Sequence, residues 1–203
     1  LKDRLRYFRA FDFNPGATEK STALLGIMKG TTDNEITKLC LRHLDPGFVK
    51  TSTEAQQSLK KLLDASVGTS DYIDLVLRFE PASESKRLLQ IATEKPMQRE
   101  GRDAARQLLK QNEEPLLWTT INGKDAAKAQ SVLTSLRSVG TKQSIGILQT
   151  VALDPKRSKA LRAEATRALG GSMDGEDLVL ALLKDGKFSG DYKAAAVQGV
   201  SGA

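Results

Sequence analysis

The sequence predicts an all-α fold, and three observations support this prediction. Ala, Leu, Lys, Gln and Glu, which favour helices, are abundant, whereas aromatic residues make up only 5% of the 203 residues. Apolar residues recur at helical spacing along almost the whole chain, and no strand-like alternation lasts beyond about five positions. Hydrophobic residues make up 39% and charged residues 28%, which is typical of a folded globular chain rather than a disordered one.

The helical periodicity divides the chain into successive segments joined by two to seven residues. Such short connections make neighbouring helices antiparallel. Glycines follow several segments, as C-terminal caps do, and at Gly170 we expect a left-handed conformation that ends the preceding helix. The predicted helices cover 3–12, 18–29, 33–44, 52–66, 70–79, 83–94, 97–111, 114–121, 125–138, 141–153, 158–169, 175–184 and 190–200.

The second half of the chain repeats itself. Ala105, Leu133, Ala165 and Ala196 occupy equivalent places in four helices rich in small residues, at steps of 28, 32 and 31 residues. A short turn and a helix rich in Leu, Ile or Val follow the first three of these helices. A period near 30 residues with two helices per repeat is typical of an α-solenoid. The sequence therefore predicts a right-handed α-α superhelix of about six helix pairs.

One of these repeats resembles the HEAT-repeat family. Its pattern is carried by Asp154, Pro155, Arg162, Ala163, Ala165, Ala168, Leu169 and Gly170. The resemblance implies a HEAT-like (armadillo-like helical) solenoid, and it is clearest over residues 97–203. Residues 1–96 are helical but loosely periodic, so there the assignment is an extension. We expect one HEAT-like domain over residues 1–203.

A segment near the start of the chain and a stretch near its end carry a narrower resemblance. Residues 6–13 (RYFRAFDF), 178–187 and 194–196 are similar to parts of large bacterial membrane-bound dehydrogenase or haem-binding multidomain proteins. In that family a sugar-dehydrogenase-like β-propeller precedes HEAT-like helices, and a c-type cytochrome module often follows. The resemblance implies a periplasmic or extracytoplasmic location. The chain begins without Met and ends directly after a helical pattern, so we expect it to be a piece of a longer polypeptide.

Motifs for catalysis, cofactors or metals are missing from the sequence. A single cysteine, Cys40, and a single histidine, His43, exclude a disulfide within the chain and any site that needs two such residues. Neither a haem attachment motif Cys-x-x-Cys-His nor a phosphate-binding glycine loop is present. We expect Cys40 to be a buried structural residue and His43 to lie at a helix end. The sequence predicts no catalytic, cofactor-binding or metal-binding residue, and any dehydrogenase or cytochrome activity would lie outside residues 1–203.

An aromatic cluster near the start of the chain is the candidate docking site. Tyr7, Phe8, Phe11 and Phe13 include pairs at helical spacing. They can face a flanking domain or a protein partner, or they can form the core at the end of the solenoid, and the sequence leaves both possibilities open. Non-catalytic scaffolding between domains is the leading hypothesis for the function.

The positive charge suggests an alternative function. The formal net charge is +6, and residues 81–203 hold 19 basic and 14 acidic side chains, against 12 and 11 in residues 1–80. Lys156, Arg157, Lys159 and Arg162 form the densest basic cluster, a possible anion-contacting patch on a HEAT-like protein that binds nucleic acid. The few aromatic residues lie away from these cations, so bases have no stacking platform and nucleic acid is not the expected partner. A small-molecule ligand and a transmembrane segment are not expected either.

Overall fold

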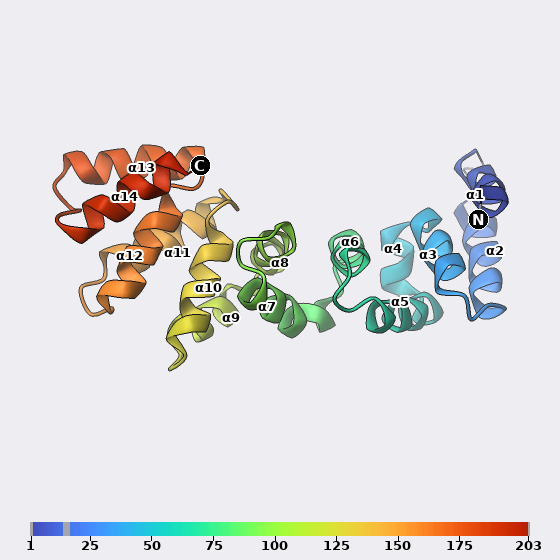
Figure 1. The fold of residues 1–203 in the computed structure, drawn as a ribbon. Coiled ribbons are helices and arrows are strands. Elements are labelled where there is room, and N and C mark those ends of the chain that lie inside the picture. Colours follow the sequence, from blue (N-terminus) through green and yellow to red (C-terminus); the bar gives the residue numbers. More distant parts are fainter. Residues whose placement is uncertain (1, 14–16, 203) are drawn as a thin grey trace. The chain divides into compact units, whose positions relative to one another are not determined.

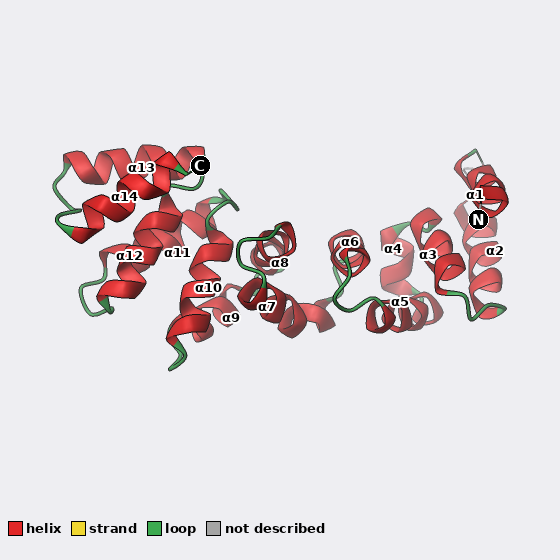
Figure 2. Ribbon diagram, in the orientation of Figure 1, coloured by secondary structure: helices red, strands yellow, loops and turns green. Residues whose placement is uncertain are grey.

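A computed structural model describes residues 2–13 and 17–202. Within these ranges every regular element is helical, with fourteen α-helices and two short 3-10 turns. Figure 2 shows these helices joined by loops. The predicted all-α fold class is therefore confirmed. The chain divides into two compact units, residues 1–80 and residues 81–203, which are described separately below.

The first unit contains six α-helices among its described residues. Three of these helices begin after an Asp or Ser whose side chain accepts hydrogen bonds from the amides of the first turn. Asp33 caps α3, Asp45 caps α4 and Ser52 caps α5. The elements are α1 (Lys2–Arg9), the 3-10 turn η1 (Ala10–Asp12), α2 (Ala17–Lys29), α3 (Asn34–His43), α4 (Pro46–Thr51), α5 (Thr53–Ala65) and α6 (Ser70–Phe79).

Helix α4 was not predicted, because the segment between residues 44 and 52 was interpreted as a connection. Pro46 occupies the first turn of this helix, where a missing N–H costs nothing, and Asp45 caps it. Ser52 closes α4 and caps α5 directly afterwards. A six-residue helix is too short to show a period in the sequence.

The second unit contains the other eight α-helices. They are α7 (Ser85–Glu94), which follows the 3-10 turn η2 (Ala82–Glu84), α8 (Arg99–Lys110), α9 (Glu114–Ile121), α10 (Ala126–Leu136), α11 (Lys142–Leu153), α12 (Lys159–Leu169), α13 (Met173–Lys184) and α14 (Asp191–Ser201). All eight correspond to predicted helices, with ends that differ by a few residues. Capping fixes several starts, for example Thr141 and Ser144 in a reciprocal capping box at α11.

The helices rich in small residues form one layer of the second unit. Helix α10 packs on α8 and α12, and α12 packs on α14; Figure 1 shows α12 and α14 side by side. The other helices flank this layer, α7 against α8, α9 against α10 and α11 against α12. Ala105, Leu133, Ala165 and Ala196, the four positions that define the repeat, are all buried in these layered helices. This packing is compatible with a helical repeat.

Gly170 does not have the predicted left-handed conformation. Its φ is −74°, so the end of α12 does not require a glycine for its backbone angle. The requirement is space, because a Cβ on Gly170 would lie 2.7 Å from the amide nitrogen of Val200 and 2.8 Å from the carbonyl carbon of Gly199. The glycine therefore lets the end of α12 approach the backbone of α14.

Candidate functional site

Of the four aromatic residues near the start of the chain, Phe8 is buried, Phe11 is half-buried, and Tyr7 and Phe13 are exposed. Phe8 is buried and stacks on the His43 ring with 6.0 Å between ring centroids. Phe11 is half-buried, with centroids 6.0 Å from Phe8 and 6.4 Å from His43. Nδ1 of His43 also lies 2.9 Å from Oδ1 of Asp12. These contacts attach α1 and η1 to the C-terminal end of α3.

Tyr7 and Phe13 point away from that anchor into solvent. Their exposed fractions are 76% and 86%, and the neighbouring Leu5 is 41% exposed. Arg6 and Arg9 are exposed beside them on α1. Phe8 thus belongs to the core of the first unit, whereas Tyr7 and Phe13 lie on its surface. We call Leu5, Tyr7 and Phe13 the N-terminal apolar patch.

Cys40 is fully buried on α3, and burial raises the pKa of its thiol to about 11. The thiol therefore stays protonated near neutral pH, whereas nucleophilic and metal-binding cysteines act as thiolates. Among residues 2–13 and 17–202, no group of three or more His, Cys, Asp or Glu residues is arranged to hold a metal ion. His43, one turn from Cys40, is occupied by its contacts with Asp12 and the two phenylalanine rings.

The basic cluster between α11 and α12 is partly neutralised. Nε of Arg157 lies 3.2 Å from Oδ2 of Asp154, and the Arg157 side chain also donates to Oδ1 of Asn122. The pKa of Asp154 lies below its usual value, first because the backbone N–H of Lys156 donates to this carboxylate and further because of the Arg157 charge. Much of the charge of Arg157 is thus compensated.

Arg162 is likewise engaged within the fold. Its Nε donates to the carbonyl oxygen of Ala152 over 3.1 Å, and its guanidinium lies 4.3 Å from the centre of the Tyr192 ring. Lys156 and Lys159 differ, because both side chains are exposed and neither forms an ion pair within the described part of the chain. Of the four predicted anion-contacting residues, these two lysines are the ones available to a ligand.

A second charged cluster, which the sequence analysis missed, lies on α8. Asp103 is only 5% exposed, and its two oxygens lie 3.1 Å from Nε of Arg99, 3.2 Å from Nε of Arg102 and 3.5 Å from Nη1 of Arg106. The signal in the sequence is the spacing, because arginines at positions i−4, i−1 and i+3 of one aspartate can all reach it on a helix.

Comparisons with known proteins leave the chain without an assigned family. No protein-family model, no curated protein and no solved structure matches it. In the part of the chain that the structure describes, no helix has both the length and the apolar character needed to cross a bilayer.

Proposed function

We propose that residues 1–203 are a non-catalytic scaffold and interdomain segment of a larger bacterial exported redox-type protein. In this proposal the dehydrogenase-like propeller and the c-type cytochrome modules lie outside this chain, and residues 1–203 hold no cofactor. The short motifs at residues 6–13 and 178–187 motivate the identity of the parent protein. The contact with a neighbouring domain is made through the N-terminal apolar patch.

The observation that carries the docking role is the exposure of two aromatic rings on an anchored segment. Tyr7 and Phe13 are 76% and 86% exposed, while Phe8, between them in sequence, is held in the core. Rings of this kind bury large apolar areas when a partner covers them, and aromatic and arginine side chains are enriched in protein interfaces. Because Phe8 and Phe11 already fix the segment on His43, less conformational freedom is lost on docking.

The first test is the mass of the polypeptide in its source cells. An intact mass well above the 22.1 kDa of this chain is expected, and a mature product of about that mass would refute the proposal. In the longer polypeptide, hydrogen exchange of residues 5–13 should be slower than in isolated 1–203. Changing Tyr7 and Phe13 together to Ser should remove this protection. Val67→Ser is the matched control, because Val67 is also an exposed apolar residue (55%) of the first unit and should leave the protection unchanged.

The alternative function, binding of nucleic acid by the basic second unit, depends on Lys156 and Lys159. If it holds, fluorescence anisotropy with duplex DNA will show binding that weakens steeply with salt. Changing both lysines to Gln would then reduce the salt slope by about two, since each phosphate contact contributes about one. Lys187→Gln, at another exposed lysine of the same unit, is the control. Binding that is weak and equal in all variants would contradict this alternative, and the scaffold proposal would be the remaining one.

A further inference from the structure

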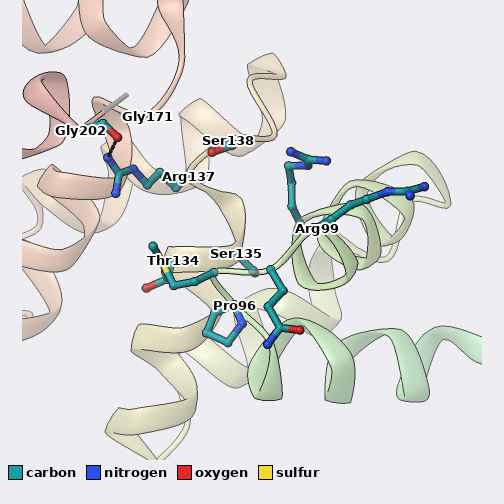
Figure 3. A pocket seen from close by; sticks show the side chains of 11 residues that line it. Pro96, Arg99, Thr134, Ser135, Arg137, Ser138, Gly171 and Gly202 are labelled. Atoms are coloured by element: carbon teal, nitrogen blue, oxygen red, sulfur yellow. Dashed lines mark hydrogen bonds between the residues drawn. The ribbon is translucent and has the colours of Figure 1, made fainter. Parts of the chain in front are cut away.

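A cavity of about 260 Å³ lies within the second unit, where four of its segments meet. The start of α8, the end of α10, the turn after α12 and the end of α14 all contribute to it. Figure 3 shows Arg137 and Ser138 on the α10 side and Arg99 on the α8 side. The lining residues are Pro96, Met97, Gln98, Arg99, Arg102, Thr134, Ser135, Arg137, Ser138, Gly171 and Gly202.

The lining contains three arginines and no acidic residue. In this respect the cavity differs from one in the first unit. A larger cavity of about 340 Å³ in the first unit also has three basic residues, Lys38, Arg42 and Arg78, but Asp71 and Asp74 line it too. There Lys38 forms an ion pair with Asp71. In the cavity of the second unit, no lining residue is an Asp or Glu that could pair with the lining arginines.

The surrounding carboxylates do not balance the arginines. Asp103 is not one of the lining residues and is shared by Arg99, Arg102 and Arg106. Within the described residues, the hydrogen bonds of the Arg137 side chain go to carbonyl oxygens, those of Gly199 at 3.3 Å and Gly202 at 2.8 Å. Three guanidinium groups, those of Arg99, Arg102 and Arg137, line the cavity, and Asp103 is the carboxylate that pairs with two of them, which leaves two positive charges in excess.

Two glycines leave room for the Arg137 side chain at the cavity. A Cβ on Gly171 would lie 2.1 Å from Cγ of Arg137, and one on Gly202 would lie 3.0 Å from its Nη2. The Arg137 side chain therefore occupies space that only glycine at position 171 leaves open. Since its two carbonyl partners use one nitrogen, Nη2, the other N–H groups of the fork can still donate to a ligand.

We propose that this cavity binds a phosphate group, either as the free ion or as a small phosphomonoester. Guanidinium groups donate pairs of parallel hydrogen bonds to phosphate oxygens, and an excess of two positive charges matches a dianion better than a monoanion. Neutral donors complete the lining, because the hydroxyl of Ser138 forms no hydrogen bond within the described residues and Gln98 does not cap α8 with its side chain. The volume admits a phosphate with a small organic group attached.

Isothermal titration calorimetry on the full chain at constant ionic strength tests the proposal. Inorganic phosphate should bind with a 1:1 stoichiometry, and acetate, a monoanionic carboxylate, should bind at least about tenfold more weakly. Glycerol phosphate distinguishes the two sources: tighter binding than inorganic phosphate assigns the cavity to a monoester, and weaker binding assigns it to the free ion. Both results support the proposal, whereas equal affinity for acetate and phosphate overturns it.

Variants decide whether the binding occurs in this cavity. Arg99→Gln and Arg102→Gln should each weaken phosphate binding about tenfold, since each removes a charged donor from the lining. Arg106→Gln is the matched control, because Arg106 pairs with the same Asp103 but does not line the cavity, and should change affinity less than about twofold. Gly171→Ala should also weaken binding by displacing Arg137. Circular dichroism melting verifies that each variant is folded, and equal affinity in all folded variants overturns the proposal.

Discussion

The two units of the chain are both helical, but glycine has different roles in them. In the first unit, no described glycine approaches the backbone of another element: Gly26 and Gly68 face open space, Gly30 meets only its own helix, and Gly47 meets the Asp45 side chain. In the second unit, a Cβ added at any of five glycines would come within 3.0 Å of backbone atoms of another segment. These are Gly101, Gly170, Gly171, Gly175 and Gly199.

This difference shows that close approach of backbones contributes to the packing of the second unit, whereas the described glycines of the first unit make no such approach; both units also bury large side chains. Gly199 faces the carbonyl oxygen of Arg167 at the crossing of α14 and α12, where Ala165 and Ala196 are also buried. In the first unit the largest fully buried side chain is Tyr72, and Leu24, Leu41, Leu44 and Leu63 fill much of the remaining core. Small residues that recur at a fixed place produce a visible repeat, whereas a core of varied large residues does not.

Polar contacts between helices also differ between the two units. Ion pairs between long, exposed side chains link helices of the first unit, such as Lys29 with Glu54 at 3.4 Å. The second unit has a continuous chain across its layer: Thr134 of α10 donates to Glu164 of α12, Glu164 pairs with Arg167, and Arg167 donates to Gln198 of α14. Such short bridges are possible because these helices lie close together.

The largest expected effect comes from a charge placed at the close crossing. Ala165→Glu puts an unpaired carboxylate at a fully buried position between α12 and α14, which should destabilise the second unit by about 4 kcal/mol or more. The matched variant is Ala55→Glu, at a fully buried alanine of α5 in the first unit. Hydrogen exchange followed by mass spectrometry reports each unit separately.

Each of these two variants should lose protection only in its own unit. If Ala165→Glu instead removed protection from residues 17–79 to the same extent as from residues 97–201, the two units would unfold as one and the comparison would fail. If Ala165→Glu kept the parent melting temperature, the repeat register that places Ala165 between helices would be wrong.

A second pair of variants measures the role of glycine directly. Gly199→Ala places a Cβ 2.4 Å from the carbonyl oxygen of Arg167, and forcing α14 away from α12 should cost about 2–3 kcal/mol. Gly26→Ala, inside α2 and with nothing within 4 Å of its Cβ, should raise stability by up to about 1 kcal/mol. Urea unfolding measures both. Effects of the same sign and size at the two positions would show that close approach is not what distinguishes the units.

Much of the fold could be predicted from the sequence because its signals are local. Helical periodicity located every α-helix except α4, whose six residues are too few to show a period. The predicted equivalent positions Ala105, Leu133, Ala165 and Ala196, which follow a regular step, are all buried in packed helices, and this is compatible with a helical repeat. The reason for Gly170 was not predictable, because its close neighbours Gly199 and Val200 lie about thirty residues later in the chain.

The candidate sites were less predictable, since exposure and pairing depend on the tertiary structure. Spacing alone grouped Phe8 with Tyr7 and Phe13, but only the position of His43 shows that Phe8 is buried. The basic cluster was found by counting charged residues, but the residues that contact its arginines lie far away in sequence. Tyr192 is 30 residues from Arg162, and Asn122 is 35 residues from Arg157. The arginine cavity combines residues from 96 to 202 and has no local signature.

The third prediction uses the single cysteine as a probe of the first unit. The pKa of Cys40 rises from 9.0 to about 11 on folding, so between these values the unfolded chain loses its thiol proton while the folded chain keeps it. Unfolding is therefore favoured increasingly as pH rises from about 9 to about 11, and below pH 9 the effect vanishes. The wild type should lose about 1–2 kcal/mol more than Cys40→Ala over this interval, measured by urea unfolding. Parallel pH profiles would show that the thiol is not buried.

The smallest expected effect concerns a cost of close packing in the second unit. Gln107 on α8 is 2% exposed, and within the described residues its Nε2 has no hydrogen-bond partner. A buried amide without a partner destabilises the folded state, and methionine has nearly the same length and a high helix propensity. Gln107→Met should therefore raise the free energy of unfolding by about 1 kcal/mol. Gln90→Met is the control, because Gln90 is exposed and its amide donates to Glu94, so that change should bring no gain. Loss of stability in Gln107→Met would mean that this amide does have a hydrogen-bond partner in solution. Close packing of the helices in the second unit would then not leave this buried polar group unpaired.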